Sequence, residues 1–202
     1  MSSSSSPQRS WLRSRWWVTV QWVLATAIGF WLSLLWVEIG ERPDLGVFNG
    51  SIGAVTIALT QLPVLAKRID RAPWWIVASI ASWGLLGLSP VGALGWVAPR
   101  TLDLGTRAFY GAIEGVKIGI VTGIAQWLVL KLSLPRAWRW IPVNAIAWAI
   151  ALALGWTIGG VLRRATHLFV SEPIGLSVAW IAIATLTGVA LAALLPDRER
   201  SE

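Results

Sequence analysis

Polar side chains inside otherwise apolar stretches are the residues of this sequence that could do chemistry. Gln61 and Gln126 lie in two such stretches, and Thr26, Ser79 and Asn144 lie in three others. Polar residues inside membrane-spanning segments are costly and are functional candidates by default. These amides and hydroxyls would either bond between helices, at ~0.6 kcal/mol each, or line a small hydrophilic site. The residues alone leave both interpretations open.

Two charged residues, Glu114 and Lys117, also interrupt an apolar stretch. Their i, i+3 spacing places them on one helix face, where they can pair. We expect them to form such a pair, with the lysine reaching toward the membrane surface. The alternative is a salt bridge to a partner subunit or a role in transport.

A stripe of glycines at four-residue spacing follows one face of the same stretch, at Gly111, Gly115, Gly119 and Gly123. Small residues at this spacing allow the backbone of another helix to approach closely. The stripe therefore predicts either a packing seam inside the protein or a groove for a flat ligand or a partner helix.

Several kinds of chemistry are excluded by composition. The chain has no cysteine and a single histidine, His167. Disulfides, thiolate zinc sites and thiol nucleophiles are therefore absent, and a lone histidine without acidic neighbours is poor evidence for a metal. We predict a protein that is not an enzyme, with no catalytic residues, no metal site and no cofactor beyond contact with a lipid or pigment.

The elements that position these residues are long apolar helices. Of the 202 residues, 55% are hydrophobic and 13% are charged, against about 25% charged in an ordinary soluble domain. About 20 apolar helical residues cross the hydrocarbon core of a membrane. Six segments approach or exceed this length: residues 16–37, 46–66, 73–98, 109–130, 140–162 and 174–196. We predict an all-α, polytopic transmembrane helix bundle over 11–197, with a disordered polar tail at 1–10 and a short charged tail at 198–202.

An internal repeat relates these segments. Eight of the 23 residues at 61–83 recur 65 positions later, and Trp22, Ala25, Thr26 and Phe30 match positions 53 residues further on. In this alignment Gln61 corresponds to Gln126. The chain therefore reads as three helical hairpins that enter the membrane in the same direction, as parallel repeats do.

The distribution of basic residues predicts the orientation. Eleven of the 17 lysines and arginines fall in the two termini and the loops at 67–73 and 131–139, five fall in the other loops, and Lys117 lies in a span. The positive-inside rule then places both termini in the cytoplasm. The net charge of +7 is explained by contact with anionic lipid headgroups, and we expect no binding to nucleic acid.

The 16 tryptophans mostly fall at the ends of the predicted spans. Tryptophan at span ends is typical of an aromatic belt at the lipid headgroups. We expect this role for Trp11, Trp16, Trp17, Trp74, Trp75, Trp96, Trp138 and Trp140. Four deeper residues, Trp31, Trp83, Trp127 and Trp148, are expected between helices or against a lipid or pigment ring.

The motif Gln-Trp-x-Val-Leu-x(5)-Arg-Ala-x-x-Trp-Ile at 126–141, repeated between glycine-rich spans, resembles tryptophan-rich multipass membrane proteins of cyanobacteria and similar bacteria. That family has no assigned function, and the resemblance covers residues 16–195. It implies a bacterial inner membrane, either plasma or thylakoid. From these observations we expect an accessory subunit that packs against other integral membrane proteins and lipid, and the alternative is a small transporter or channel.

Overall fold

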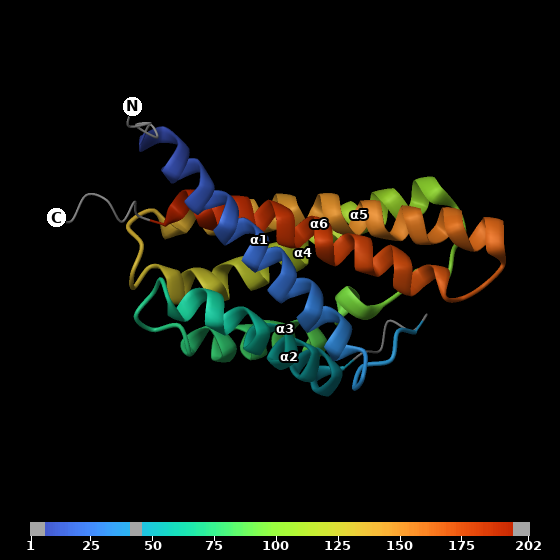
Figure 1. The fold of residues 1–202 in the computed structure, drawn as a ribbon. Helices are drawn as coiled ribbons and strands as arrows, with labels where there is room; N and C mark the ends of the chain where they lie inside the picture. Colours follow the sequence, from blue (N-terminus) through green and yellow to red (C-terminus); the bar gives the residue numbers. More distant parts are fainter. Residues whose placement is uncertain (1–6, 41–45, 196–202) are drawn as a thin grey trace, which may run out of the picture.

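The computed structural model describes residues 7–40 and 46–195, with side chains from residue 15 onward. This part of the chain is built of helices (Figure 1): α1 (Pro7–Ser33), α2 (Val47–Ala66), α3 (Trp74–Leu88), η1 (Leu94–Trp96), α4 (Leu104–Leu130), η2 (Ala137–Arg139), α5 (Trp140–Thr166) and α6 (Ser171–Leu194). The predicted tail at 198–202, most of the predicted tail at 1–10, and Arg42 lie outside the described residues. Residues 7–10 of that predicted tail belong to α1, with Pro7 at a helix start, where its missing N–H costs no hydrogen bond.

The α-helices pack in chain order. Each one contacts the next, and α6 returns to contact α1, so that the described helices form a closed ring. The ring brings the start of α1 and the end of α6 to one end of the bundle (Figure 1), which we call the termini end. The α2–α3 and α4–α5 loops lie at the same end.

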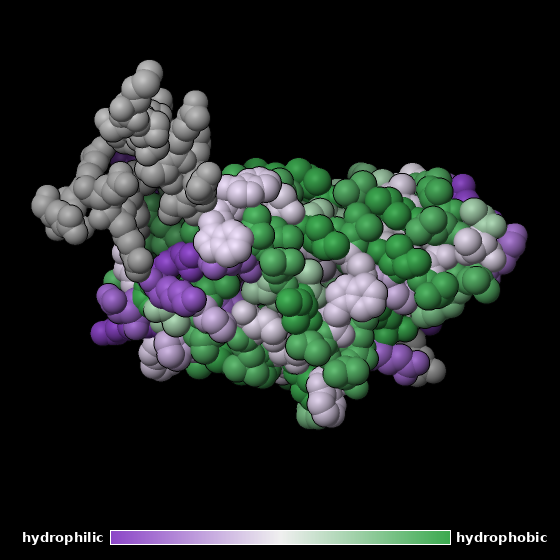
Figure 2. Space-filling model, viewed as in Figure 1, coloured by the Kyte–Doolittle hydropathy of each residue, from purple (hydrophilic) through white to green (hydrophobic). Residues whose placement is uncertain are grey.

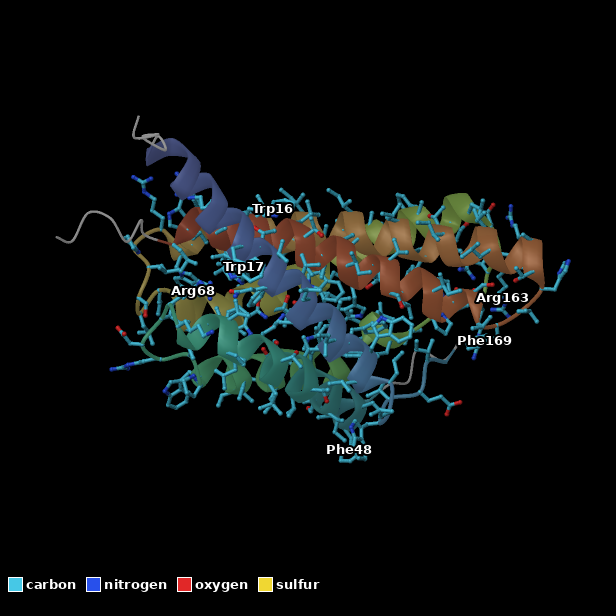
Figure 3. The ribbon with its side chains drawn as sticks, viewed as in Figure 1. Trp16, Trp17, Phe48, Arg68, Arg163 and Phe169 are labelled. Atoms are coloured by element: carbon cyan, nitrogen blue, oxygen red, sulfur yellow. The ribbon has the colours of Figure 1, made fainter. Side chains whose placement is uncertain are left out.

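Four of the described helical stretches are long and apolar enough to cross a membrane, which indicates membrane insertion: Val47–Ala66, Leu104–Leu130, Ala137–Thr166 and Ser171–Leu194. Most of their exposed side chains are apolar. Figure 2 shows hydrophobic residues over most of the visible face and hydrophilic ones mainly toward its ends. Trp16 and Trp17 lie exposed near the termini end, as expected for belt residues, whereas Phe48 and Phe169 are exposed near the other end (Figure 3).

The helix α3 is shorter than the apolar segment predicted at 73–98. It ends at Leu88, because Ser89 is extended (φ −92°, ψ 163°) and precedes Pro90, whose ring disfavours helical backbone in the residue before it. Gly92 then turns the chain with φ 70°. With 15 residues at ~1.5 Å each, α3 alone is too short for a hydrocarbon core of ~30 Å.

The segment after α3 folds back into the bundle, and we call residues 93–98 the plug. All six are buried. Irregular backbone at membrane depth requires partners from the protein, and here tryptophan side chains supply two of them. The indole of Trp180 donates to the Gly95 carbonyl at 3.0 Å, and that of Trp156 donates to the Val97 carbonyl at 2.9 Å. The Ala98 amide donates to the Gly40 carbonyl at 3.0 Å.

The glycine stripe on α4 faces α5. A Cβ built on each glycine would approach an α5 backbone Cα closely: Gly111 to Ala153 at 2.8 Å, Gly115 to Ala149 at 2.7 Å, Gly119 to Ala145 at 2.6 Å and Gly123 to Ile141 at 3.1 Å. The stripe is thus a packing seam between two helices of this chain. The predicted alternative, a groove open to a ligand or a partner helix, does not occur here, because the α5 backbone fills it.

Candidate functional site

Three tryptophans form a layer across the bundle near the termini end. Trp22, Trp75 and Trp140 come from α1, α3 and α5, and their rings meet edge to face with centroids 5.7 to 6.4 Å apart. The predicted repeat relates these three positions by 53 and 65 residues. We expected Trp75 and Trp140 in a belt at the headgroups, but both are buried. Their indole N–H groups have partners inside the protein, and this removes the reason for a tryptophan to lie at an interface.

Each indole of this layer donates a hydrogen bond to the neighbouring even-numbered helix. The bonds are Trp22 to Thr187 Oγ1 at 3.0 Å, Trp75 to Gln61 Oε1 at 2.8 Å and Trp140 to Gln126 Oε1 at 2.9 Å. They join α1 to α6, α3 to α2 and α5 to α4. The two glutamines that the repeat equates therefore make the same contact.

A second aromatic layer lies two helical turns further toward the plug. The rings of Trp83 and Trp148 lie 5.5 Å apart, and both contact Trp180 of α6. Phe30 stacks on Trp180 at 5.4 Å, and Trp96 of the plug contacts Trp83 at 4.9 Å. Trp96 was also expected in a headgroup belt. It is instead buried, and its indole donates to Ser33 Oγ at 2.8 Å.

A cavity of about 40 Å³ lies between the two layers. Tryptophans from both layers contribute to its wall, together with polar side chains from all six helices. The polar residues include Thr26, Gln61, Ser79, Gln126, Asn144 and Thr187. The structure therefore gathers all five uncharged polar candidates from the sequence around one space. A volume of this size accommodates roughly two or three water molecules.

The amide orientations follow from their partners. An indole N–H only donates and a backbone carbonyl only accepts. Trp140 therefore fixes the Gln126 oxygen toward itself, which leaves the Gln126 Nε2 group on the other side. The Asn144 Nδ2 group donates to the Trp140 carbonyl at 3.0 Å, which leaves Oδ1 free to accept. Gln61 uses both ends of its amide, because its Nε2 donates to Thr26 Oγ1 at 2.9 Å.

Three groups at the cavity keep hydrogen-bonding capacity. Among the described residues, Gln126 Nε2, Asn144 Oδ1 and Ser79 Oγ have no side-chain or backbone hydrogen-bond partner. Each of these three atoms keeps some accessible surface. Asn144 and Ser79 are only 3% and 4% exposed. The surface that their free atoms retain therefore faces the cavity. A buried polar group left unpaired costs about 1–3 kcal/mol, so the site favours a molecule that pairs with these groups.

The Glu114–Lys117 pair lies away from this cavity. Lys117 Nζ is 2.7 Å from Glu114 Oε1, and the lysine side chain is 48% exposed. His167 ends α5 in the left-handed conformation and is exposed. No cluster of potential metal ligands occurs among the described residues.

One strong polar contact was not predicted. Arg107 and Glu172, at the starts of α4 and α6, form a buried ion pair through two hydrogen bonds of 2.6 and 2.9 Å. The other guanidinium N–H groups donate to the carbonyls of Pro99, Thr101 and Trp156. All five N–H donors of the guanidinium are satisfied. Arg107 thereby connects the loop that follows the plug, at Pro99 and Thr101, to α5 and α6. Arg107 and Glu172 lie just outside the predicted spans at 109–130 and 174–196. Their separation of 65 residues, which equals the offset of the predicted repeat, is the signal that could have linked them.

Comparisons with protein-family models, with curated proteins and with solved structures found no match for this chain.

Proposed function

We propose that this chain is a small membrane transporter or channel whose solute site is the cavity between the two tryptophan layers. One observation carries the proposal. The cavity is lined by hydrogen-bonding groups from every helix, and Asn144 Oδ1, Ser79 Oγ and Gln126 Nε2 have no protein partner there. A layer that served only to hold helices together would pair these groups with one another.

The accessory-subunit hypothesis needs an exposed face on which a partner could pack. One candidate for such a face, besides exposed aromatic residues, was the glycine stripe on α4. Since α5 covers that stripe, its small residues are explained by contacts within the chain. We therefore prefer the transporter proposal.

The topology that accompanies this proposal has six spans, with both termini in the cytoplasm of a bacterium and the protein in its inner membrane. Support comes from α1, whose residues 16–33 are uncharged, and from the plug, which follows the short α3 and is buried in the bundle. The basic loops at 67–73 and 131–139 lie at the termini end, which the positive-inside rule assigns to the cytoplasm. The predicted repeat then gives three parallel hairpins, whose equivalent residues include Thr26, Ser79 and Asn144.

Reconstituted vesicles test the function. The rates at which vesicles reswell in water, glycerol, ethylene glycol and urea gradients should exceed those of protein-free vesicles for at least one solute. Ser79→Leu places a larger apolar side chain in the cavity and should reduce that rate. Thr185→Leu is the matched control, since Thr185 is exposed on α6 and bonds only to its own helix. Equal rates with and without protein for every solute would refute the proposal.

A further inference from the structure

We propose that the solute is a small uncharged amide, of the class of urea and acetamide. This inference rests on the proposed function, because it specifies what the same cavity takes. It follows from the charge, the hydrogen-bonding groups and the size of the cavity, which are considered in turn.

The charge of the wall excludes ions. Every described residue that lines the cavity is uncharged. An ion that left water for this space would lose its hydration without gaining an opposite charge, and burial of an unpaired charge is far more costly than burial of a neutral polar group. The buried ion pair of Arg107 with Glu172 is saturated by its own contacts and does not line the cavity. The solute is therefore neutral.

The unpaired amide groups at the cavity favour a solute that carries both a hydrogen-bond donor and an acceptor. Gln126 Nε2 offers N–H donors, and Asn144 Oδ1 offers an acceptor. Both residues bind Trp140, Gln126 at the indole N–H and Asn144 at the backbone carbonyl, and both line the cavity. A molecule that pairs with both groups needs a carbonyl to accept from Gln126 and an N–H to donate to Asn144, and a carboxamide carries both. The Ser79 hydroxyl can donate to the same carbonyl or accept from a second N–H.

The size and shape of the cavity agree with this class. Its volume of about 40 Å³ limits the solute to a few heavy atoms. The indoles of Trp140, Trp83 and Trp148 contribute to its wall from both layers. Flat aromatic walls make their largest dispersion contact with a planar molecule. Urea and acetamide are planar at the amide and small, whereas glycerol is neither.

The test compares amides with alcohols in reconstituted vesicles. Urea and acetamide should enter faster than in protein-free vesicles, and the increase should be larger than for ethylene glycol and glycerol. Asn144→Leu removes the acceptor and should reduce the amide rate about tenfold, the effect of one lost buried hydrogen bond. Gln126→Glu retains an oxygen for Trp140 but replaces the N–H donor, and should reduce the rate similarly. Ser82→Ala is the control, because Ser82 is buried one turn from Ser79 but does not line the cavity.

The outcomes separate this inference from the proposed function. Entry of water or alcohols without amides would overturn the amide class and leave a solute channel. Amide entry that persists in both Asn144→Leu and Gln126→Glu would overturn the binding mode. Entry of no solute at all would overturn the proposed function itself. Melting curves in detergent verify that each variant is folded, and the two variants act on different helices, so that failure of one to fold leaves the other informative.

Discussion

Arg107 and Glu172 lie 65 residues apart in the chain, and their side chains meet in a buried pair with hydrogen bonds of 2.6 and 2.9 Å. The exposed fractions of the two side chains are 0% and 2%. Because Arg107 also binds the carbonyls of Pro99 and Thr101, the pair fixes the loop that leads from the plug into α4. The plug in turn contacts the second tryptophan layer through Trp96, so we expect the ion pair to influence the shape of the cavity.

Removal of one partner of this pair should be strongly destabilising. Arg107→Met leaves Glu172 as a buried charge that only the more distant Arg163 contacts, at 3.4 Å. We expect the free energy of unfolding to fall by about 3–5 kcal/mol, measured by thermal or denaturant unfolding in detergent. The double variant with Glu172→Leu should recover part of this loss. A single variant as stable as the wild type would contradict the anchoring role.

The Glu114–Lys117 pair should contribute much less. It lies at the surface of α4 and its lysine is 48% exposed, so a coupling of about 0.5–1 kcal/mol is expected. Glu114→Gln and Lys117→Met, alone and combined, give the double-mutant cycle. Additive effects of the two single changes would mean that these residues do not stabilise each other. Loss of solute entry in a stable double variant would instead assign them a role in transport.

The helical character and the approximate position of most elements could be predicted from the sequence, because lipid-facing and core-facing side chains are both apolar and leave long uncharged runs. The exact ends of the helices were harder to predict from the sequence. The helix α4 begins at Leu104 rather than near residue 109, because Asp103 caps it by accepting a bond from the Thr106 amide at 2.7 Å. The end of α3 depends on Ser89-Pro90, a local signal inside a run that hydropathy treats as continuous.

The position of a tryptophan along a span does not reveal whether its side chain faces lipid or the core. Trp74 and Trp75 are consecutive, yet Trp74 is 58% exposed and Trp75 is fully buried. Consecutive residues on a helix point about 100° apart, so one can face lipid while the other faces the core. The predicted repeat aligns Thr26, Ser79 and Asn144, and all three line the cavity. It missed Arg107 and Glu172 because their charges are opposite, and a search for identities passes over such a pair.

The seam between α4 and α5 can be tested with a single methyl group. Gly119→Ala would place a Cβ 2.6 Å from the Ala145 Cα, and separation of the two backbones should cost about 1–3 kcal/mol. Gly105→Ala is the control, because a Cβ there meets only the Asp103 carboxylate at 3.6 Å. Unfolding in detergent should show a lower melting temperature for Gly119→Ala alone. Equal stability of the two variants would mean that the helices approach less closely than described.

The cap of α4 predicts a dependence on pH. The hydrogen bonds from Thr106 lower the pKa of Asp103 below its ordinary value of 3.8, with a smaller contribution from the charge of Arg164. A lowered pKa in the folded state means that the cap stabilises the protein above pH 3.8 and that this contribution is lost as the pH falls below that value. The melting temperatures of wild type and Asp103→Ala should therefore differ at pH 7 and converge toward pH 3. A difference that is constant with pH would show that the carboxylate charge is not involved.

Access of water to the cavity is the most direct test of the account. The chain has no cysteine, so a thiol introduced at one position is the only thiol in the protein. Ser79→Cys and Ser82→Cys lie one turn apart on α3, and only Ser79 lines the cavity. The measurement is the rate of reaction of each variant, in native membranes, with methyl methanethiosulfonate, a small uncharged thiol reagent. Rapid labelling of Ser79→Cys together with slow labelling of Ser82→Cys is the predicted result. Slow labelling of both before denaturation and rapid labelling of both after it would show a closed, dry layer, and would contradict a solute site between the two tryptophan layers.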